Sequence, residues 1–159
     1  MTDEQIEKYM RAAIEQAKMA EEQDEVPVGA IVVYNDEIIG AGFNYKENTQ
    51  NPIDHAEIRA IKQAAEKIGS WRLIDCDIFI TLEPCPMCAG AIVQSRIRSV
   101  YFGAYDPKAG CGGSILNILE EPRFNHRCEF KGGILEEECA FLLKNYFAKK
   151  RKPPISTEI

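Results

Sequence analysis

Two short segments constrain this chain most, because together they carry the residue types that bind zinc. His55-Ala56-Glu57 supplies an imidazole, and Pro84-Cys85-Pro86-Met87-Cys88 supplies two thiols in a C-x-x-C spacing. Imidazole and thiolate are ligands that zinc prefers, and a C-x-x-C lets two sulfur atoms reach one ion from a single helical turn. The fold is therefore expected to bring His55, Cys85 and Cys88 together around one metal ion.

Three protein ligands leave one tetrahedral position of zinc open, and an open position is typical of catalytic rather than structural zinc. A water molecule there has its pKa lowered towards about 7 and becomes a nucleophile at neutral pH. Glu57 lies two residues after His55 on the expected helix, and side chains at that separation do not face each other. We therefore predict that Glu57 is not a ligand but the general acid and base of the reaction.

A C-x-x-C motif alone is less specific, because it also occurs in redox pairs and in structural zinc sites. A structural site needs a fourth ligand, for which the candidates are Cys76, Cys111, Cys128 and His126. The chain has no second C-x-x-C and no His-x-x-x-His. We interpret the cysteines that stand singly as small buried apolar residues, not as disulfides; they are Cys76, Cys111, Cys128 and Cys139.

The rest of the chain alternates between helical and strand patterns. Helices are expected over residues 2–22, 54–68 and 86–94, with a closing helix that carries Leu135, Cys139, Leu142 and Tyr146 on one stripe. Strands are expected over 28–34, 37–43, 77–82, 99–103 and 129–132. This alternation predicts an α/β domain in which helices cover a mixed central sheet.

Local signals support several of these boundaries. They are a capping box at Thr2-x-x-Gln5, a hairpin turn at Asn35-Asp36, a first helical proline at Pro86 and a terminating glycine at Gly69. The helix over 54–68 is expected to carry Ile58, Ile61, Ala65 and Ile68 on one face. Residues 44–53 are expected to form a polar loop.

Size and charge restrict the remaining possibilities. We expect residues 1–159 to form a single domain, with 153–159 as a flexible tail. A net charge of −6 argues against nucleic-acid binding over the whole surface, but residues 141–159 carry five bases against one acid. The acidic, polar start is not a secretory signal and no segment is apolar for long enough to cross a bilayer, so we expect a cytoplasmic protein without membrane contact.

Further segments extend the pattern along nearly the whole chain. They are Val26-Pro-Val-Gly-Ala30, Gly42-Phe-Asn44, Thr81-Leu-Glu-Pro-Cys-Pro-Met-Cys-Ala-Gly90, Ser95-Arg-Ile97, Phe102-Gly-Ala104, Asp106 with Lys108, and Asn125-His-Arg127. With them the chain resembles the bacterial tRNA-specific adenosine deaminases of the cytidine-deaminase-like superfamily. The combination H-x-E…P-C-x-x-C is the known signature of zinc nucleobase deaminases.

This resemblance implies a three-layer α/β/α fold, one Zn²⁺ per chain and a homodimer. It also implies hydrolysis of adenosine to inosine at the wobble position of a tRNA anticodon stem-loop. Asn44 would then hydrogen-bond the purine and the backbone around Ala56 would line its Watson–Crick edge, with Val28, Asp106 and Phe147 as further substrate-binding residues. The candidate RNA contacts are Lys108, His126, Lys149, Lys150, Arg151 and Lys152.

Several of these residues have a second interpretation. Phe147 is as readily part of the apolar face of the closing helix as a stacking platform for RNA bases, and Tyr146 is better read as part of that face. His126 is more typical of a surface or dimer contact than of an RNA contact. The bases at 149–152 equally suit a solvated helix end, where cations favour the helix dipole.

One residue departs from the family pattern. A small residue, usually alanine, is expected just before His55, but this chain has Asp54, which either caps the helix or orients a neighbouring group. Separately, Met87, Ile92, Val93 and Ile97 are more apolar than one helix needs to cover a small sheet, which we take as a hint of the dimer face.

Two other functions remain open at this point. A free nucleobase or nucleoside deaminase would use the same zinc site but would not need a basic C-terminal end. A non-catalytic, zinc-stabilised interaction module would need a fourth protein ligand and would have no use for Glu57.

Overall fold

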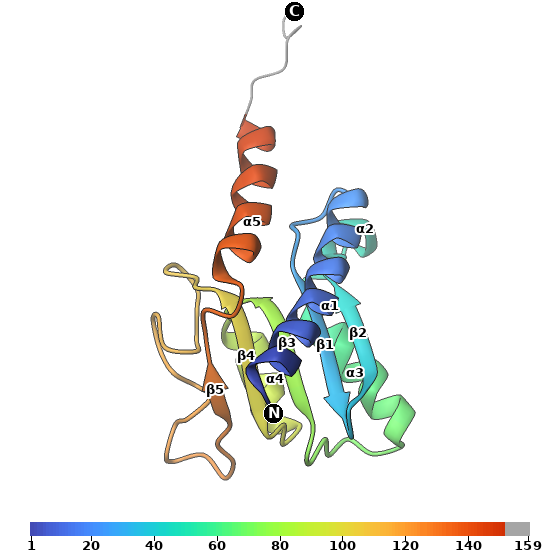
Figure 1. Cartoon of the computed structure of the whole chain (residues 1–159), viewed down its shortest axis with the longest axis vertical. Helices are drawn as coiled ribbons and strands as arrows, with labels where there is room; N and C mark the ends of the chain where they lie inside the picture. The colour runs from blue at the N-terminus through green and yellow to red at the C-terminus, as the bar shows by residue number, and fades with distance from the viewer. Residues whose placement is uncertain (152–159) are drawn as a thin grey trace, which may run out of the picture.

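A single mixed sheet organises residues 1–151, which are the residues that the computed structural model describes. Its strands are β1 Gly29–Tyr34, β2 Glu37–Phe43, β3 Asp77–Leu82, β4 Ser99–Ala104 and β5 Glu129–Lys131, in the order β2-β1-β3-β4-β5. Strand β1 is antiparallel to both β2 and β3, whereas β4 is parallel to β3 and to β5. The predicted mixed sheet is confirmed (Figure 1).

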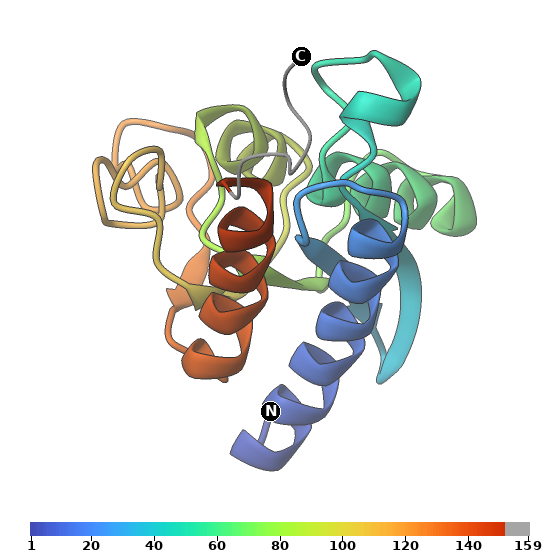
Figure 2. The same ribbon diagram turned by 90° about the horizontal axis from the view of Figure 1, so that it is seen from above.

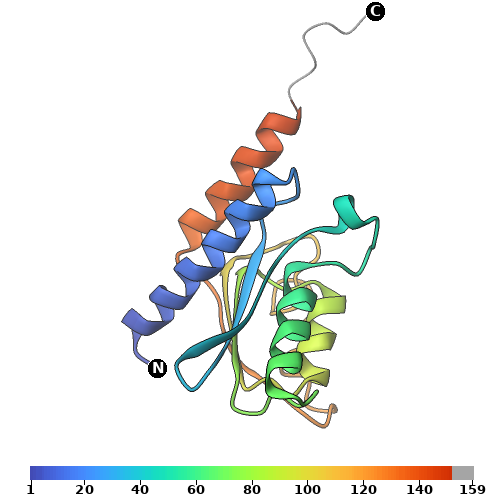
Figure 3. The same cartoon turned by 90° about the vertical axis from the view of Figure 1, so that its right-hand side faces the viewer.

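Helices cover both faces of this sheet, so the predicted three-layer α/β/α architecture is confirmed (Figure 3). One layer contains α1 Asp3–Glu22 and α5 Glu136–Arg151, which lie side by side when viewed from above (Figure 2). The other contains α3 Ala56–Ile68 and α4 Pro86–Gln94. Alternate residues of the strands feed two apolar cores: in β1, Ala30 and Val32 pack towards α3, and Ile31 and Val33 towards α1.

The local signals in the sequence act as expected. Thr2 and Gln5 form the capping box of α1, with the Gln5 backbone N–H donating to Thr2 Oγ1 at 3.1 Å. Asn35 and Asp36 take positive φ angles of 49° and 60°, as a two-residue hairpin turn requires. Gly69 ends α3 with a φ of 78°. The observed boundaries lie within two residues of those predicted, although Leu135 lies just before α5.

The prediction of a plain loop over residues 44–53 is wrong, because this segment contains a short helix, α2 Lys46–Thr49. Its start is held by Glu25, a carboxylate that is only 1% exposed. Glu25 accepts hydrogen bonds from the backbone N–H groups of Glu47 at 3.2 Å and Asn48 at 2.8 Å, and from Asn48 Nδ2 at 2.7 Å. A four-residue helix is not stable alone, so this one depends on a distant side chain that no local pattern reveals.

The predicted apolar face of α3 is partly confirmed, because Ile61 and Ala65 pack against the core. The helix buries Ala60 and Ala64, whereas Ile68 is 37% exposed. The reason is the close approach of α3 to β2, where a Cβ atom added to Gly40 would lie 2.2 Å from the Ala60 carbonyl oxygen. Only small residues fit on both sides of such a contact, so alanine replaces isoleucine as the buried residue.

The apolar side chains of α4 and its following turn, which the sequence suggested as a dimer face, do not form an exposed patch. Ile92, Val93 and Ile97 are buried within the chain, and Met87 is half-buried. These side chains cover their own sheet, so they give no independent support for a dimer. No helix within residues 1–151 is long and apolar enough to span a membrane.

Candidate active site

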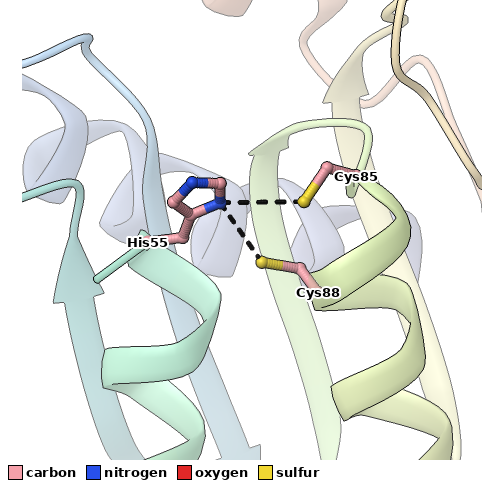
Figure 4. Close-up of side chains that lie close together, drawn as sticks. All are labelled: His55, Cys85 and Cys88. Atoms are coloured by element: carbon pink, nitrogen blue, oxygen red, sulfur yellow. Dashed lines mark hydrogen bonds between the residues drawn. The ribbon is translucent and has the colours of Figure 1, made fainter. Parts of the chain in front are cut away.

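The two motif segments meet at one end of the sheet (Figure 4). His55 is the residue that precedes α3, Cys85 precedes α4, and Cys88 lies in the first turn of α4. His55 Nδ1 lies 3.7 Å from Cys85 Sγ and 3.5 Å from Cys88 Sγ. The fold thus brings the three predicted ligands together from segments that are thirty residues apart.

These separations suit a tetrahedral metal ion. With bonds of about 2.3 Å to sulfur and about 2.0 Å to nitrogen, tetrahedral zinc holds a nitrogen and a sulfur ligand roughly 3.5 Å apart. Within residues 1–151, His55, Cys85 and Cys88 form the only group of three or more metal-binding side chains, with all ligand atoms within 4.8 Å of one another. None of the candidates for a fourth ligand, including Cys111, joins this group. The cluster can therefore hold a metal and leave a position free for a non-protein ligand.

The two cysteines differ in the pKa of their thiols. The hydrogen bond from Cys88, together with one from His55, lowers the pKa of the Cys85 thiol to about 4, so its sulfur is a thiolate at neutral pH. The same hydrogen bond to Cys85, with burial, raises the pKa of Cys88. Both sulfur atoms lie at the N-terminal end of α4, where the helix dipole favours negative charge. A metal bound at this cluster would find one sulfur already ionised.

Glu57 is close to this cluster without belonging to it. The side chain lies in the first turn of α3 and is only 4% exposed. Burial raises the pKa of Glu57 to about 7, against a smaller opposing effect of backbone hydrogen bonding. A carboxyl group with a pKa near neutrality can both accept and donate a proton at physiological pH, as general acid–base catalysis requires.

Three of the predicted substrate-binding residues form one continuous unit. Asn44, in the loop after β2, uses its Oδ1 atom to accept the backbone N–H of Ala56 at 2.9 Å. The backbone N–H of Asn44 in turn donates to the carbonyl oxygen of Val28 at 3.2 Å. The Ala56 N–H is therefore committed to Asn44, whereas the Asn44 Nδ2 atom has no partner within residues 1–151 and stays available for another group.

A buried carboxylate that the sequence reasoning missed organises the loop after β4. Glu83 is 2% exposed and accepts hydrogen bonds from the backbone N–H groups of Asp106, Gly112 and Ser114, each at 2.9 Å. Burial disfavours ionisation of Glu83, but these bonds and one from the Ser114 hydroxyl outweigh it and lower its pKa. An acidic residue directly after an apolar strand was the available signal. Glu83 thereby attaches residues 106–114 to the strand that leads to Cys85.

Asp106 and Lys108, both expected at the substrate, lie in this loop. The Asp106 carboxylate accepts the backbone N–H groups of Lys108 at 3.0 Å and Ala109 at 3.2 Å, so it stabilises its own turn. Lys108 is exposed.

The remaining expected contacts come from other parts of the chain. Phe147 is 42% exposed on α5, whereas Tyr146 is buried and donates its hydroxyl to the Asp24 carbonyl oxygen at 3.3 Å, as its interpretation as an apolar-face residue requires. His126 donates from Nε2 to the carbonyl oxygen of Ile97 at 2.7 Å, at the end of α4 that is opposite to Cys85. The structure does not bring His126 to the candidate site.

Two of the four C-terminal bases are paired with acids. Lys150 Nζ lies 2.6 Å from Asp24 Oδ1, and Lys149 Nζ lies 3.8 Å from Glu21 Oε2. Arg151 is exposed at the end of α5, and Lys152, like the predicted tail 153–159, falls outside the described residues. Glu21 lies in the last turn of α1 and Asp24 lies just after this helix. The two ion pairs therefore link α1 to α5.

The cysteines that stand singly are buried and free, as predicted; they are Cys76, Cys111, Cys128 and Cys139. Burial raises the pKa of the thiol to about 11 in Cys76 and to about 12 in Cys128 and Cys139. Their thiols are protonated at neutral pH, which fits their role as packing residues.

A three-layer fold with a His/Cys/Cys cluster and an adjacent buried carboxylate is the arrangement of a nucleobase deaminase. The sequence model of the MafB19-like deaminase family matches residues 4–151. A tRNA-specific adenosine deaminase of Bacillus subtilis is 51% identical over 148 residues, which cover 93% of this chain and 92% of the relative. A tRNA-specific adenosine deaminase of Haemophilus influenzae is 44% identical over 147 residues, covering 92% and 85% of the two chains.

A solved structure from a study of A-to-I editing by tRNA:A34 deaminases at the wobble position of transfer RNA is similar in fold. It superposes with a TM-score of 0.82 at 39% sequence identity, over 85% of this chain and 98% of the other. The chain therefore belongs to the tRNA-specific adenosine deaminase family.

Proposed function

We propose that this chain hydrolyses adenosine to inosine at the wobble position of a tRNA anticodon, using one zinc ion held by His55, Cys85 and Cys88. The observation that carries the proposal is the convergence of these three ligands beside the buried Glu57 carboxyl group. Similarity to proteins named tRNA-specific adenosine deaminases over more than nine-tenths of the chain supports the substrate. A zinc ion at this site would activate a water molecule for attack on a carbon atom.

Glu57 moves the protons in this reaction. The deamination adds water to C6 of adenine and releases ammonia, so protons must pass from the water to N1 and then to the departing nitrogen. Glu57 accepts the first proton as a carboxylate and donates it as a carboxylic acid, which its pKa of about 7 permits.

Asn44 orients the base. Its Oδ1 atom is held by Ala56, so the Nδ2 amide has one fixed direction and donates to an acceptor of the purine. A hydrogen-bond donor fixed in advance discriminates between bases better than a mobile one. Val28 forms the apolar wall behind Asn44, and the loop of Asp106 and Lys108 borders the anticodon nucleotides.

An anticodon-loop nucleotide suits this site, because it is already single-stranded and costs little unstacking energy to present. Phe147 is exposed on α5 and supplies a stacking surface, and Lys149, Lys150, Arg151 and Lys152 contact phosphates. The proposed location is the cytoplasm, where tRNA is found.

The same proposal includes a homodimer. Its support is a cleft of about 320 Å³ beside α4, lined by Gly90, Val93, Gln94, Arg96, Ile118, Phe124 and Asn125. Phe124 is 48% exposed there, and Leu116 in the preceding loop is 59% exposed. Exposed aromatic and aliphatic side chains around a cleft are typical of an interface.

Light scattering tests the proposed dimer. It is expected to give twice the 17.9 kDa mass of one chain for the wild type, and the mass of the monomer for Phe124→Glu.

The decisive experiment compares three substrates with purified, zinc-loaded protein. They are an anticodon stem-loop with adenosine at the wobble position, the same stem-loop with that adenosine moved one position along the loop, and free adenosine. Inosine is expected only from the first. Equal turnover of free adenosine would instead identify a small-nucleoside deaminase, and no inosine from any of the three would refute the proposal.

A further inference from the structure

Asp54, the residue that departs from the expected small side chain, forms a hydrogen-bond network with Thr49 and Arg59. We propose that Asp54 is a positioning residue: its pairing with Arg59 fixes the turn from which the metal ligand His55 leaves the loop. This inference rests on the proposed metal site, and it assigns a role to two residues that touch neither metal nor substrate.

The Asp54 carboxylate joins the two ends of the segment that leads into α3. Arg59 Nη1, one turn into the helix, donates to both carboxylate oxygens at 3.0 Å. Thr49, at the end of α2, donates from its hydroxyl to Asp54 Oδ2 at 2.8 Å. The Asp54 side chain is 13% exposed and that of Arg59 is 36% exposed, so the pair is partly shielded from water. Charge-assisted bonds of this kind are stronger than neutral ones.

Arg59 is itself held in place by aromatic rings. Its guanidinium carbon lies 5.0 Å from the ring centre of Tyr45 and 5.7 Å from that of Phe43. These two residues flank Asn44, whose side chain caps α3 at Ala56. The backbone N–H of Tyr45 also donates to the Asp54 carbonyl oxygen at 3.1 Å. Residues 43–45, Asp54 and the first turn of α3, which lie on both sides of His55, are therefore connected into one unit by these contacts.

His55 depends on this unit for its orientation. Its backbone is also held by two hydrogen bonds, from its own N–H to the Ile53 carbonyl oxygen at 2.7 Å and from the Arg59 N–H to its carbonyl oxygen at 3.1 Å. It lies at the boundary between loop and helix, is only half-buried, and makes no capping hydrogen bond with its own side chain. A small rotation of the backbone at this boundary would change the distances of 3.5 and 3.7 Å from its Nδ1 atom to the two sulfur atoms. Metal sites tolerate deviations of only about 0.2 Å in ligand distance, so a loose turn weakens metal binding.

The test measures zinc affinity directly, by competition with a chromophoric chelator, in the full-length protein. Asp54→Ala and Arg59→Ala are each expected to weaken zinc binding by about tenfold, the lower range for residues that orient metal ligands. The double variant is expected to be no weaker than either single one, because both changes break one pair. Asp54→Asn keeps an acceptor for Thr49 and Arg59 and is expected to recover part of the affinity.

Lys67→Ala is the matched control. Lys67 pairs with Glu37 at 3.3 Å at the far end of the same helix, so its loss removes an ion pair of α3 without touching the turn. Zinc affinity is expected to be unchanged in this variant. If Asp54→Ala lowered the melting temperature but bound zinc as tightly as wild type, Asp54 would stabilise the loop only and the inference would be wrong. If the wild-type protein bound no zinc, the proposed function itself would fail.

Discussion

The side-chain oxygen of Asn44 accepts the backbone N–H of Ala56 at 2.9 Å, so a residue of the loop after β2 caps the helix that carries Glu57. His55, at the usual capping position, makes no such bond with its side chain. The cap is thus supplied from outside the helix, which leaves the His55 imidazole free for the metal.

This arrangement predicts that two functions of Asn44 can be separated. Asn44→Asp keeps the oxygen that caps α3 but loses the Nδ2 donor, whereas Asn44→Ala loses both. We expect Asn44→Ala to lower the free energy of unfolding by about 1 kcal/mol and Asn44→Asp to leave it nearly unchanged. Both variants are expected to lose kcat/KM on the anticodon stem-loop. Full activity of Asn44→Asp would show that the amide does not contact the purine.

A second prediction separates metal binding from proton transfer. Glu57→Gln is expected to retain one zinc per chain and the native fold but to lose activity by about a hundred- to ten-thousand-fold, since a general acid–base group contributes that much. Cys88→Ala is expected to lose the zinc as well. Elemental analysis beside the inosine assay distinguishes the two. Loss of zinc from Glu57→Gln would make Glu57 a ligand and overturn its assigned role.

The third prediction concerns alkaline pH. Burial raises the pKa of the Cys139 thiol from 9.0 to about 12, so the unfolded chain ionises this thiol at a lower pH than the folded one. The resulting stability is complete below pH 9 and is lost as the pH rises towards 12, by about 1.4 kcal/mol per pH unit. Urea unfolding at pH 8, 9 and 10 should show a smaller decline in Cys139→Ala than in wild type. Parallel declines would contradict a buried, neutral thiol.

The last prediction concerns the basic end of α5. If Lys149, Lys150 and Lys152 contact RNA phosphates, replacing all three with alanine should weaken anticodon stem-loop binding. It should also flatten the dependence of log affinity on log salt by about two units, at roughly 0.7 per contact. Turnover of the anticodon stem-loop at saturating concentration should not change, because the zinc site is untouched. An unchanged slope would mean that RNA crosses another face.

The ion pairs at the end of α5 allow a second test of RNA binding, in which the acids are changed instead of the lysines. RNA must compete with Asp24 and Glu21 for two of these lysines. Asp24→Asn with Glu21→Gln is therefore expected to tighten RNA binding at low salt. Glu138→Gln serves as the control, because it removes a charge from the ion pair with Arg11 at the other end of α5.

The metal site was predictable because short motifs define it: His55, Cys85 and Cys88 each stand at a helix start that local signals reveal. The short helix α2 was not, because it depends on the buried carboxylate of Glu25, more than twenty residues away in sequence. The full burial of Ala60 and Ala64 on α3 was also not predictable from local sequence. Hydrophobic periodicity depends only on the sequence of the helix itself. The size of the side chains that fit between α3 and the sheet is set by the neighbouring strand, here by Gly40 and Gly42 of β2.

The contact between α3 and β2 also limits how this enzyme can change. A side chain at Gly40 would meet the Ala60 carbonyl oxygen at 2.2 Å, and one at Gly42 would meet that of Ala56 at 2.6 Å. The helix that carries Glu57 therefore cannot move towards the sheet, and any larger residue would push it, with the catalytic groups, out of register. Evolution or engineering towards another base is expected to leave this helix in place and to act through the segments that follow β2 and β4, residues 44–54 and 105–117.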